Sequence, residues 1–392
     1  MLVTRIIGKC PGCKRENSFG NVNIHQNLLL RGCTHCDYSI QIPLPALSKK
    51  IIYLDQFFLS HAFRANLKQF VEATNIIAEL AHEQLVVCPY SPIHKTETLQ
   101  WRHSQKEQLL EFIKKTSRGN EFYPEYRIKM TQITTSFKRF LENDQKALSI
   151  NLRDAFPREI NNWEDYFWID VKGSLEDTER IRKSKEDSVA QIVGLFQNWR
   201  TQNTTFKQDQ RFELIDGAKV YIQLYVEMAQ RLANGDVTAI LDSPINAKIV
   251  ENLLHFDKDE IDIQNRLNRV VRFFNSKYYY EVPSEFISSG LFAALKQKVK
   301  NGHYVNEGKA KKKLSGIFYD ISFMSTYAPY CDTMFIDNPM IDLIKEPELN
   351  LEEKFNTIFF ARKNWDEFMD YLTKIKEQKS QEIDWALSLV HV

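Results

Sequence analysis

Apolar and polar positions follow two different periods along this chain, and the change between them divides it into parts. Short apolar runs typical of buried strands lie at 51–54, 85–88, 333–336 and 356–361. Helical patterns follow at about 60–84 and 364–378, and another helix is expected between Ser284 and Gly302. This alternation predicts an α/β fold with a parallel sheet of about five strands.

From about residue 100 to residue 275 the apolar positions recur almost only at helical spacing, as in 192–199. The alternation of strand, turn and helix resumes near Tyr278. We therefore expect an all-helical insertion between two halves of one α/β domain, with Glu164 and Asp165 on a solvated face. Some aromatic side chains of the insertion could stack on bases, although a place in a helix-bundle core is the better interpretation. They are Trp163, Tyr166, Phe167 and Trp168.

Four of the six cysteines form two Cys-x-x-Cys pairs near the N-terminus, on either side of a strand-like stretch at 22–30. Each pair can form a tight turn that directs two thiolates at one ion, so the two pairs predict a tetrahedral structural zinc site. No secretion signal is evident, which favours metal over disulfides. His25 and His35 are expected to be bystanders. The predicted zinc ligands are Cys10, Cys13, Cys33 and Cys36.

The pattern thus divides the 392 residues into a zinc ribbon (1–48), the first half of an α/β core (49–100), the helical insertion (101–277) and the second half of the core (278–392). A formal net charge of +1 means that any nucleic-acid contact must come from a local patch. The basic run 309–313 could be a solvated loop or a loop that contacts phosphate. No apolar run approaches the ~20 residues of a membrane helix, so we expect a cytoplasmic protein.

Acidic residues lie where the apolar runs end, and their position indicates chemistry. Asp55 directly follows the first run, Glu97 lies in the first turns of the helix after the second, and 316–338 contains Asp320, Asp332 and Asp337 among apolar residues. Carboxylates in such surroundings tend to be paired, hydrogen-bonded or bound to metal. Ligands of parallel sheets bind outside the carboxyl ends of the strands, where these acids are expected. Capping of helices and turns remains the alternative interpretation.

Other polar side chains close to these acids in sequence could position phosphate or water, or could be ordinary polar surface. They are Ser60, His94, Lys95 and Thr96. The order of these residue types does not suggest a covalent nucleophile. No GxxxxGK[ST] or GxGxxG motif indicates nucleotide binding.

Together, the acids and the apolar runs resemble the PIN-like nuclease family, here with an N-terminal zinc ribbon. The resemblance implies a parallel sheet flanked by helices and a group of acids at the strand ends, matched by Asp55, Glu97, Asp320 and Asp337. The segment 329–332, PYCD, is similar to a variant in PIN-like proteins of bacterial defence and toxin systems. Asp332 is additional to the four-acid pattern, and could replace Asp320 as a ligand or support the ligands.

The resemblance implies a metal-dependent nuclease whose carboxylates hold Mg2+ or Mn2+ and cut phosphodiester bonds, with RNA favoured over DNA. It also implies an intracellular toxin or antiphage effector; a protein partner or a homo-oligomer stays open. We expect the four matched carboxylates to converge within metal-bridging distance. The alternative is a non-catalytic zinc-ribbon protein that binds nucleic acid or acts as an adaptor, with a degenerate PIN-like core.

Overall fold

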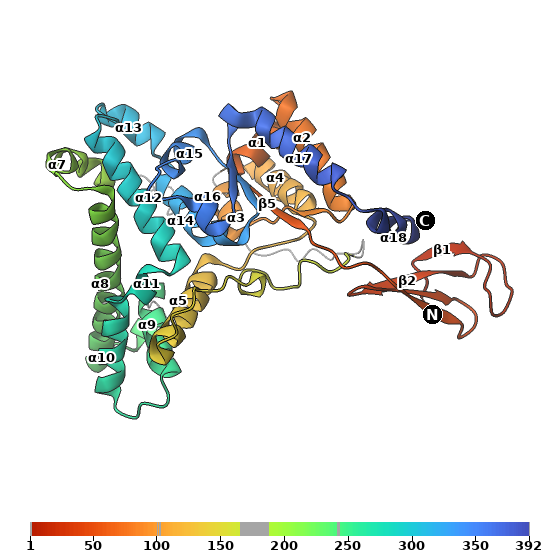
Figure 1. The fold of residues 1–392 in the computed structure, drawn as a ribbon, viewed down its shortest axis with the longest axis horizontal. Coiled ribbons are helices and arrows are strands. Elements are labelled where there is room, and N and C mark those ends of the chain that lie inside the picture. The colour runs from red at the N-terminus through yellow and green to blue at the C-terminus, as the bar shows by residue number, and fades with distance from the viewer. Residues whose placement is uncertain (1, 100, 102, 165–187, 241–243, 392) are drawn as a thin grey trace.

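The computed structural model describes residues 2–99, 101, 103–164, 188–240 and 244–391. An α/β body lies between a layer of long helices on one side and a small antiparallel sheet at the opposite end (Figure 1). No helix in these described ranges is both long and apolar enough to cross a membrane. Four residues with predicted roles in the insertion lie outside the described ranges, namely Asp165, Tyr166, Phe167 and Trp168.

The body contains a parallel sheet with the strand order β6-β5-β7-β8, which confirms the predicted α/β class. Its strands are β5 (Lys50–Leu54), β6 (Val86–Val87), β7 (Thr333–Phe335) and β8 (Ile358–Phe360). The described residues thus form four parallel strands, one fewer than expected. The stretch around Tyr278 is the short helix α11 (Lys277–Tyr280), in which Tyr278 and Tyr279 are buried against other helices.

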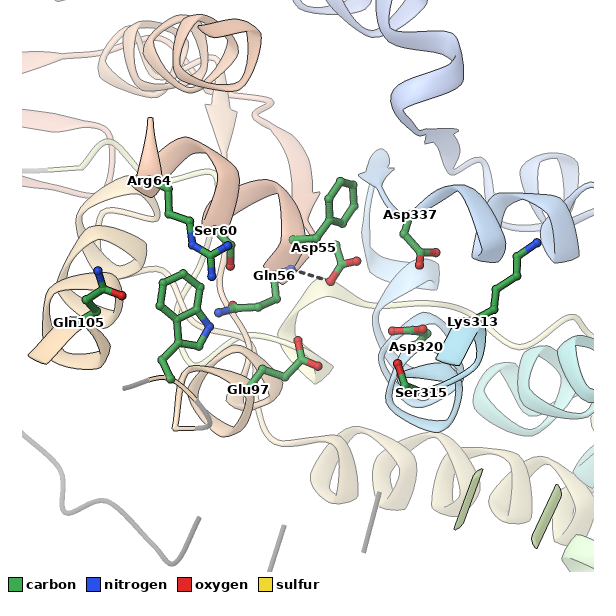
Figure 2. A pocket seen from close by; sticks show the side chains of 13 residues that line it. Asp55, Gln56, Ser60, Arg64, Glu97, Gln105, Lys313, Ser315, Asp320 and Asp337 are labelled. Carbon is green, nitrogen blue, oxygen red and sulfur yellow. Dashed lines mark hydrogen bonds between the residues drawn. The ribbon is translucent and has the colours of Figure 1, made fainter. Parts of the chain in front are cut away.

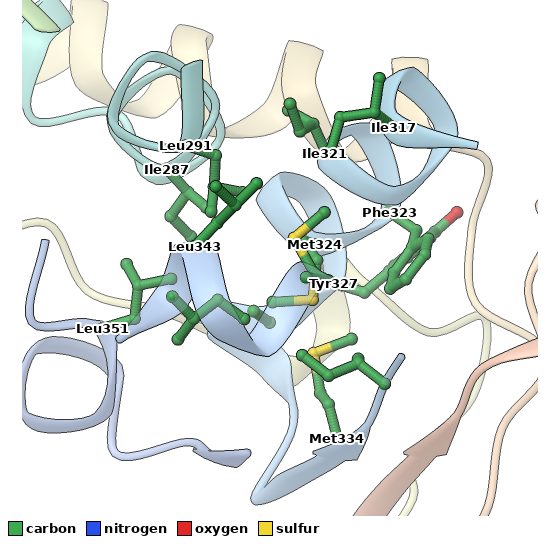
Figure 3. Close-up of a cluster of buried hydrophobic side chains, with 14 of the residues drawn as sticks. Ile287, Leu291, Ile317, Ile321, Phe323, Met324, Tyr327, Met334, Leu343 and Leu351 are labelled. Atoms are coloured by element: carbon green, nitrogen blue, oxygen red, sulfur yellow. The ribbon is translucent and has the colours of Figure 1, made fainter. Parts of the chain in front are cut away.

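Alternate side chains of the central strand enter two different hydrophobic cores. Ile52 and Leu54 pack under the helices of one face, whereas Ile51 and Tyr53 pack under the helices of the other, as the two-residue period of a strand requires. The first face is covered by α1 (Gln56–Arg64), α2 (Lys68–His82), α4 (His103–Thr116) and α17 (Trp365–Glu377). The second face, shown in Figure 3, is covered by α12 (Pro283–Lys300), α14 (Ile317–Tyr327), α15 (Asn338–Ile344) and α16 (Leu351–Phe355).

The single helix predicted at 60–84 is wrong, because α1 and α2 are separate helices. Ala65 ends α1 in a left-handed conformation with φ 50°, and its amide donates to the carbonyl oxygen of Ala62. Such a residue closes a helix C-terminus and redirects the chain. The break matters for the site, because it leaves Arg64 exposed in the last turn of α1.

The layer of long helices has its own hydrophobic core, separate from the two cores of the sheet. It is built from α5 (Glu125–Glu142), α8 (Phe206–Ala233), α9 (Ile245–Phe256), α10 (Ile263–Phe274) and α11. Leu109 and Ile113 of α4 pack instead with the core of the sheet. Trp163 is buried, but it packs with Leu29 and Leu387 of the N-terminal module and the C-terminal helix and not in the helix-bundle core where it was expected. The predicted solvated face is wrong for Glu164, whose carboxylate pairs with Arg118 at 3.1 Å.

The N-terminal module is an antiparallel sheet of β1 (Arg5–Gly8), β2 (Phe19–His25), β3 (Leu28–Cys33) and β4 (Ser39–Pro43). The stretch 22–30 therefore is a hairpin and not one strand. Arg31 and Asn21 of this module donate hydrogen bonds to the carbonyl oxygen of Leu389, at 2.9 and 3.2 Å, near the end of α18 (Gln381–Val390). Because the last carbonyls of a helix have no partner within it, these bonds join the module to the C-terminal helix.

Candidate functional site

The four N-terminal cysteines lie together, with their sulfur atoms all within 4.8 Å of one another. The Sγ atoms of Cys10 and Cys36 are 3.7 Å apart, as are those of Cys13 and Cys33. Zn–S bonds near 2.3 Å in a tetrahedron place sulfurs about 3.8 Å apart, so this cluster fits a zinc ion. Backbone amides of Cys13 and His35 donate to the sulfurs of Cys10 and Cys33, at 3.5 and 3.3 Å, and would stabilise thiolates.

A second site is a pocket of about 680 Å³ at the carboxyl ends of β5 and β7. Four of the predicted acids line it, and Figure 2 shows their side chains entering the same region from different segments. Asp55 follows β5, Asp337 follows β7, Glu97 belongs to α3 (Pro92–Thr98), and Asp320 lies in the first turn of α14. Residues separated by more than two hundred positions are thus brought to one edge of the sheet, as parallel strand ends require.

Asp55 and Asp337 occupy equivalent positions, each between a strand and the helix that follows it. One carboxylate oxygen of Asp55 accepts from the amide of Gln56 at 2.5 Å, and one of Asp337 accepts from the amide of Met340 at 2.9 Å. Both are helix N-caps, so the capping interpretation also applies to them. A carboxylate has two oxygens, and capping through one holds the side chain in a single orientation.

Gly316 makes room for the third aspartate. A Cβ atom at this position would lie 3.2 Å from Oδ2 of Asp320 and would crowd it. The basic run after residue 308 is the end of the helix α13 (Glu307–Lys313), where a loop was expected. Lys313, the last residue of α13, and Ser315 both line the pocket. They lie shortly before the first turn of α14, which contains Asp320.

His94 connects two of the acid-bearing segments from below the pocket. Its Nδ1 accepts from the amide of Ser91 at 2.9 Å, so its Nε2 donates to the carbonyl oxygen of Leu54 at 2.9 Å. Burial lowers the pKa of His94 to about 4, which keeps the ring neutral. The polar-surface interpretation is therefore wrong for His94, which ties the end of β5 to α3, three residues before Glu97.

The other polar candidates differ in position. Ser60 lines the pocket. Lys95 pairs with Glu121 at 2.5 Å, and the Thr96 hydroxyl donates to the carbonyl oxygen of Pro92 at 3.2 Å. Lys95 and Thr96 thus have local structural partners and do not line the pocket.

Asp337 is partly buried at the edge of the sheet. The pKa of Asp337 is raised, chiefly by burial and further by Asp342, although the Met340 amide and Lys313 oppose this shift. Among the described residues, no three carboxylates have oxygen atoms all within 4.8 Å of one another. Asp55, Glu97, Asp320 and Asp337 therefore share a pocket, but no three of their carboxylates meet this distance.

Asp332 is not brought to this pocket. Its carboxylate accepts from the amide of Ile51 at 2.9 Å and pairs with Lys50 at 2.8 Å, and it lines another pocket. Asp332 precedes β7 whereas Asp337 follows it, so the two lie at opposite ends of one strand. The structure therefore places Asp332 in a structural role at the amino ends of β5 and β7.

Ser60 was a candidate from the sequence, whereas Gln56 and Arg64 were not predicted. Gln56, Ser60 and Arg64 lie at positions i, i+4 and i+8 of α1, so they share one face of the helix and all line the pocket. That spacing, counted from Asp55, is the signal that could have identified them. Trp101 and Gln105 also line the pocket but come from a part of the chain without such a marker.

No family model, curated protein or solved structure matches this chain. The pocket and the cysteine cluster are therefore the features of this chain that indicate its function.

Proposed function

We propose that this protein is a metal-dependent nuclease that hydrolyses phosphodiester bonds of RNA in the pocket at the carboxyl ends of β5 and β7. One observation carries the proposal, namely that Asp55, Glu97, Asp320 and Asp337 line a single pocket although they come from four separate segments. The resemblance to PIN-like nucleases, which have acids at these places, supports this function and the preference for RNA. The similarity of the segment PYCD to defence and toxin proteins supports a role as an intracellular effector.

The residues present fit a hard divalent cation. Carboxylate oxygens are the ligands that Mg2+ and Mn2+ prefer, and both ions usually retain water in such sites. Capping bonds hold Asp55 and Asp337 in fixed orientations, which reduces the entropy lost when these side chains bind an ion. A bound Mg2+ or Mn2+ would supply an activated water and would compensate negative charge on the phosphate.

The chain itself performs the remaining tasks. Asp55, Glu97, Asp320 and Asp337 would hold the ion, and His94 positions the segments that carry the first two. Lys313 and Arg64 contribute positive charge to the lining, which offsets part of the repulsion between these acids and an incoming phosphate.

A second function is favoured by the same capping bonds. Asp55 and Asp337 each have a structural task that needs no metal, and the acids are wider apart than a closed metal site. An adaptor or nucleic-acid-binding protein with a zinc ribbon and a non-catalytic core would have these features.

Cleavage of end-labelled RNA and single-stranded DNA separates the two functions. Purified protein is incubated with Mg2+, Mn2+ or EDTA, and binding is measured in EDTA on the same substrates. The nuclease predicts products with a divalent ion and none with EDTA. Tight binding without cleavage under either ion would instead indicate the adaptor.

A further inference from the structure

The lining of the pocket has an uneven distribution of charge. In Figure 2, Arg64 and Gln105 lie on one side of the acids and Lys313 lies on the other, with Ser315 beside Asp320. A strand of nucleic acid that crosses the acids with one phosphate in the centre would bring flanking groups to both sides. The two flanks differ chemically, because only the Arg64 side contains an indole ring.

Arg64 and Trp101 form a stacked pair in this flank. The guanidinium carbon of Arg64 lies 4.2 Å from the centroid of the Trp101 ring, within the range of a cation–π interaction. Phe63 contacts the same indole, with ring centroids 6.1 Å apart and an interplanar angle of 67°, and helps to fix its plane. Arg64 is exposed and Trp101 is partly exposed, so both are available to a ligand in the pocket.

Planar guanidinium and indole groups are surfaces on which unpaired bases stack. Building on the proposed nuclease, we infer that the pocket binds single-stranded nucleic acid, with one base stacked on the Arg64–Trp101 pair beside the phosphate held at the acids. A base in a duplex is already stacked on both faces and cannot reach this pair without being unpaired. The pair therefore selects single strands over duplexes, and Lys313 contacts the backbone on the opposite flank.

Binding in EDTA tests this inference without requiring cleavage. The probes are a fluorescent single-stranded RNA, its duplex, and a series in which one nucleotide at a time is abasic. We expect the wild type to prefer the single strand and to lose about tenfold in affinity or more for abasic sites at one register, the range found for stacked bases. Arg64→Ala and Trp101→Leu should bind the intact strand about as weakly as the wild type binds that abasic probe.

The decisive result is a double-mutant comparison. In Trp101→Leu the abasic position should cost no further affinity, because the stacking partner of the base has gone. Arg127→Ala and Trp385→Leu are matched controls and should bind like the wild type. Arg127 lies over the ring of Tyr123 at 3.4 Å, and Trp385 is 51% exposed on α18, but neither lines the pocket. Arg64 is exposed, so Arg64→Ala is expected to fold. The same abasic comparison can be made with this variant if Trp101→Leu does not fold.

The outcomes separate the two proposals. Equal affinity for duplex and single strand, or an abasic effect that persists in both variants, would overturn the stacking site and leave the nuclease intact if the RNA is still cleaved. A register-specific abasic effect in a protein that cleaves nothing would keep the stacking site and overturn the nuclease. Absence of nucleic-acid binding in EDTA would overturn the stacking site, and absence of cleavage with either divalent ion as well would overturn both.

Discussion

The Nε2 of His94 donates a hydrogen bond to the carbonyl oxygen of Leu54, the residue directly before Asp55. This bond joins the end of the central strand to the helix of Glu97, so two acids from different segments share one buried anchor. His94→Leu should therefore lower the free energy of unfolding by about 1–3 kcal/mol, because it leaves a buried carbonyl unpaired. It should also lower cleavage per folded molecule. Urea unfolding and a cleavage assay on the same preparation measure both effects.

Ser136→Ala is the matched control for this prediction. The Ser136 hydroxyl is also buried and donates to a backbone carbonyl, that of Tyr278, at 2.6 Å, but in the helical layer. It should lose stability without losing cleavage in the folded fraction. Normal activity of His94→Leu would contradict the positioning role.

The neutral state of His94 also predicts a pH dependence of stability. Its pKa is about 4 in the folded protein and near 6.5 when unfolded, so the unfolded chain binds the extra proton between these values. The wild type should lose up to about 3 kcal/mol as the pH falls from 6.5 to 4, and should retain this contribution above 6.5. His94→Leu should lack this part of the slope. Equal slopes in thermal melts across this range would count against a buried neutral ring.

Asp55→Asn and Asp337→Asn should each abolish most Mg2+- or Mn2+-dependent cleavage. The double variant should be hardly worse, because groups that hold the same ion lose their effect together. Asp332→Asn is the control on the same strand as Asp337, and should keep cleavage in its folded fraction since it lies at the other end. Initial rates on labelled RNA give the comparison. Full activity of Asp55→Asn would refute the proposed site.

Asp337→Asn should stabilise the metal-free protein while it removes activity. Asparagine keeps the cap on Met340, and the change removes a carboxylate whose pKa is raised by burial and by Asp342. The raised pKa means that the charged form costs stability, and this cost develops as the pH rises from the ordinary pKa of an aspartate to the raised pKa of the folded protein. The gain in Tm should therefore be present at neutral pH and vanish in acid. Added Mn2+ should raise the Tm of the wild type only, and a lower Tm of the metal-free variant at neutral pH would contradict this account.

One zinc ion per chain is expected at Cys10, Cys13, Cys33 and Cys36. Cys33→Ser should lose zinc by metal analysis and loosen the N-terminal sheet while the α/β body stays folded. The side chains of Arg31 and Asn21 donate hydrogen bonds to the carbonyl oxygen of Leu389 at the C-terminal end of α18. Hydrogen exchange should therefore also become faster in 381–390, but not in α17. Arg31→Ala should make hydrogen exchange faster in α18 while the protein still binds zinc. This variant therefore separates the contact between the N-terminal sheet and α18 from metal binding. Unfolding of the whole chain in Cys33→Ser would contradict a separate module.

Lys313 should matter more for binding than the other lysines of its run. Lys313 lines the pocket, whereas Lys311 and Lys312 do not. In EDTA, Lys313→Ala should weaken RNA binding and reduce the slope of log affinity against log salt by about 0.7, the value for one phosphate of a single strand. Lys312→Ala has the same charge change and should have a smaller effect. Equal effects of the two would indicate a diffuse basic surface.

The sequence by itself determined which residues belong to strands of the body, where the cysteines pair and where four acids follow apolar runs. These are local properties. The period of a strand or a helix, two or 3.6 residues, and the two residues between paired cysteines are set by backbone geometry over a few positions. The capping role of Asp55 and Asp337 was equally open to prediction, because it depends on the next three residues only.

The tertiary structure decided what depends on distant segments. Asp332 and Asp337 flank the same strand, and only the parallel pairing of β7 with β5 places Asp337, and not Asp332, at the same edge of the sheet as Asp55. From the sequence, His94 could have been ordinary polar surface, whereas in the fold it is buried and bonded to the carbonyl oxygen of Leu54. Trp101 meets Arg64 only in the folded chain, because the two residues belong to different segments of the sequence. Long-range contacts of this kind depend on how whole elements pack, and no local pattern of residue types encodes them.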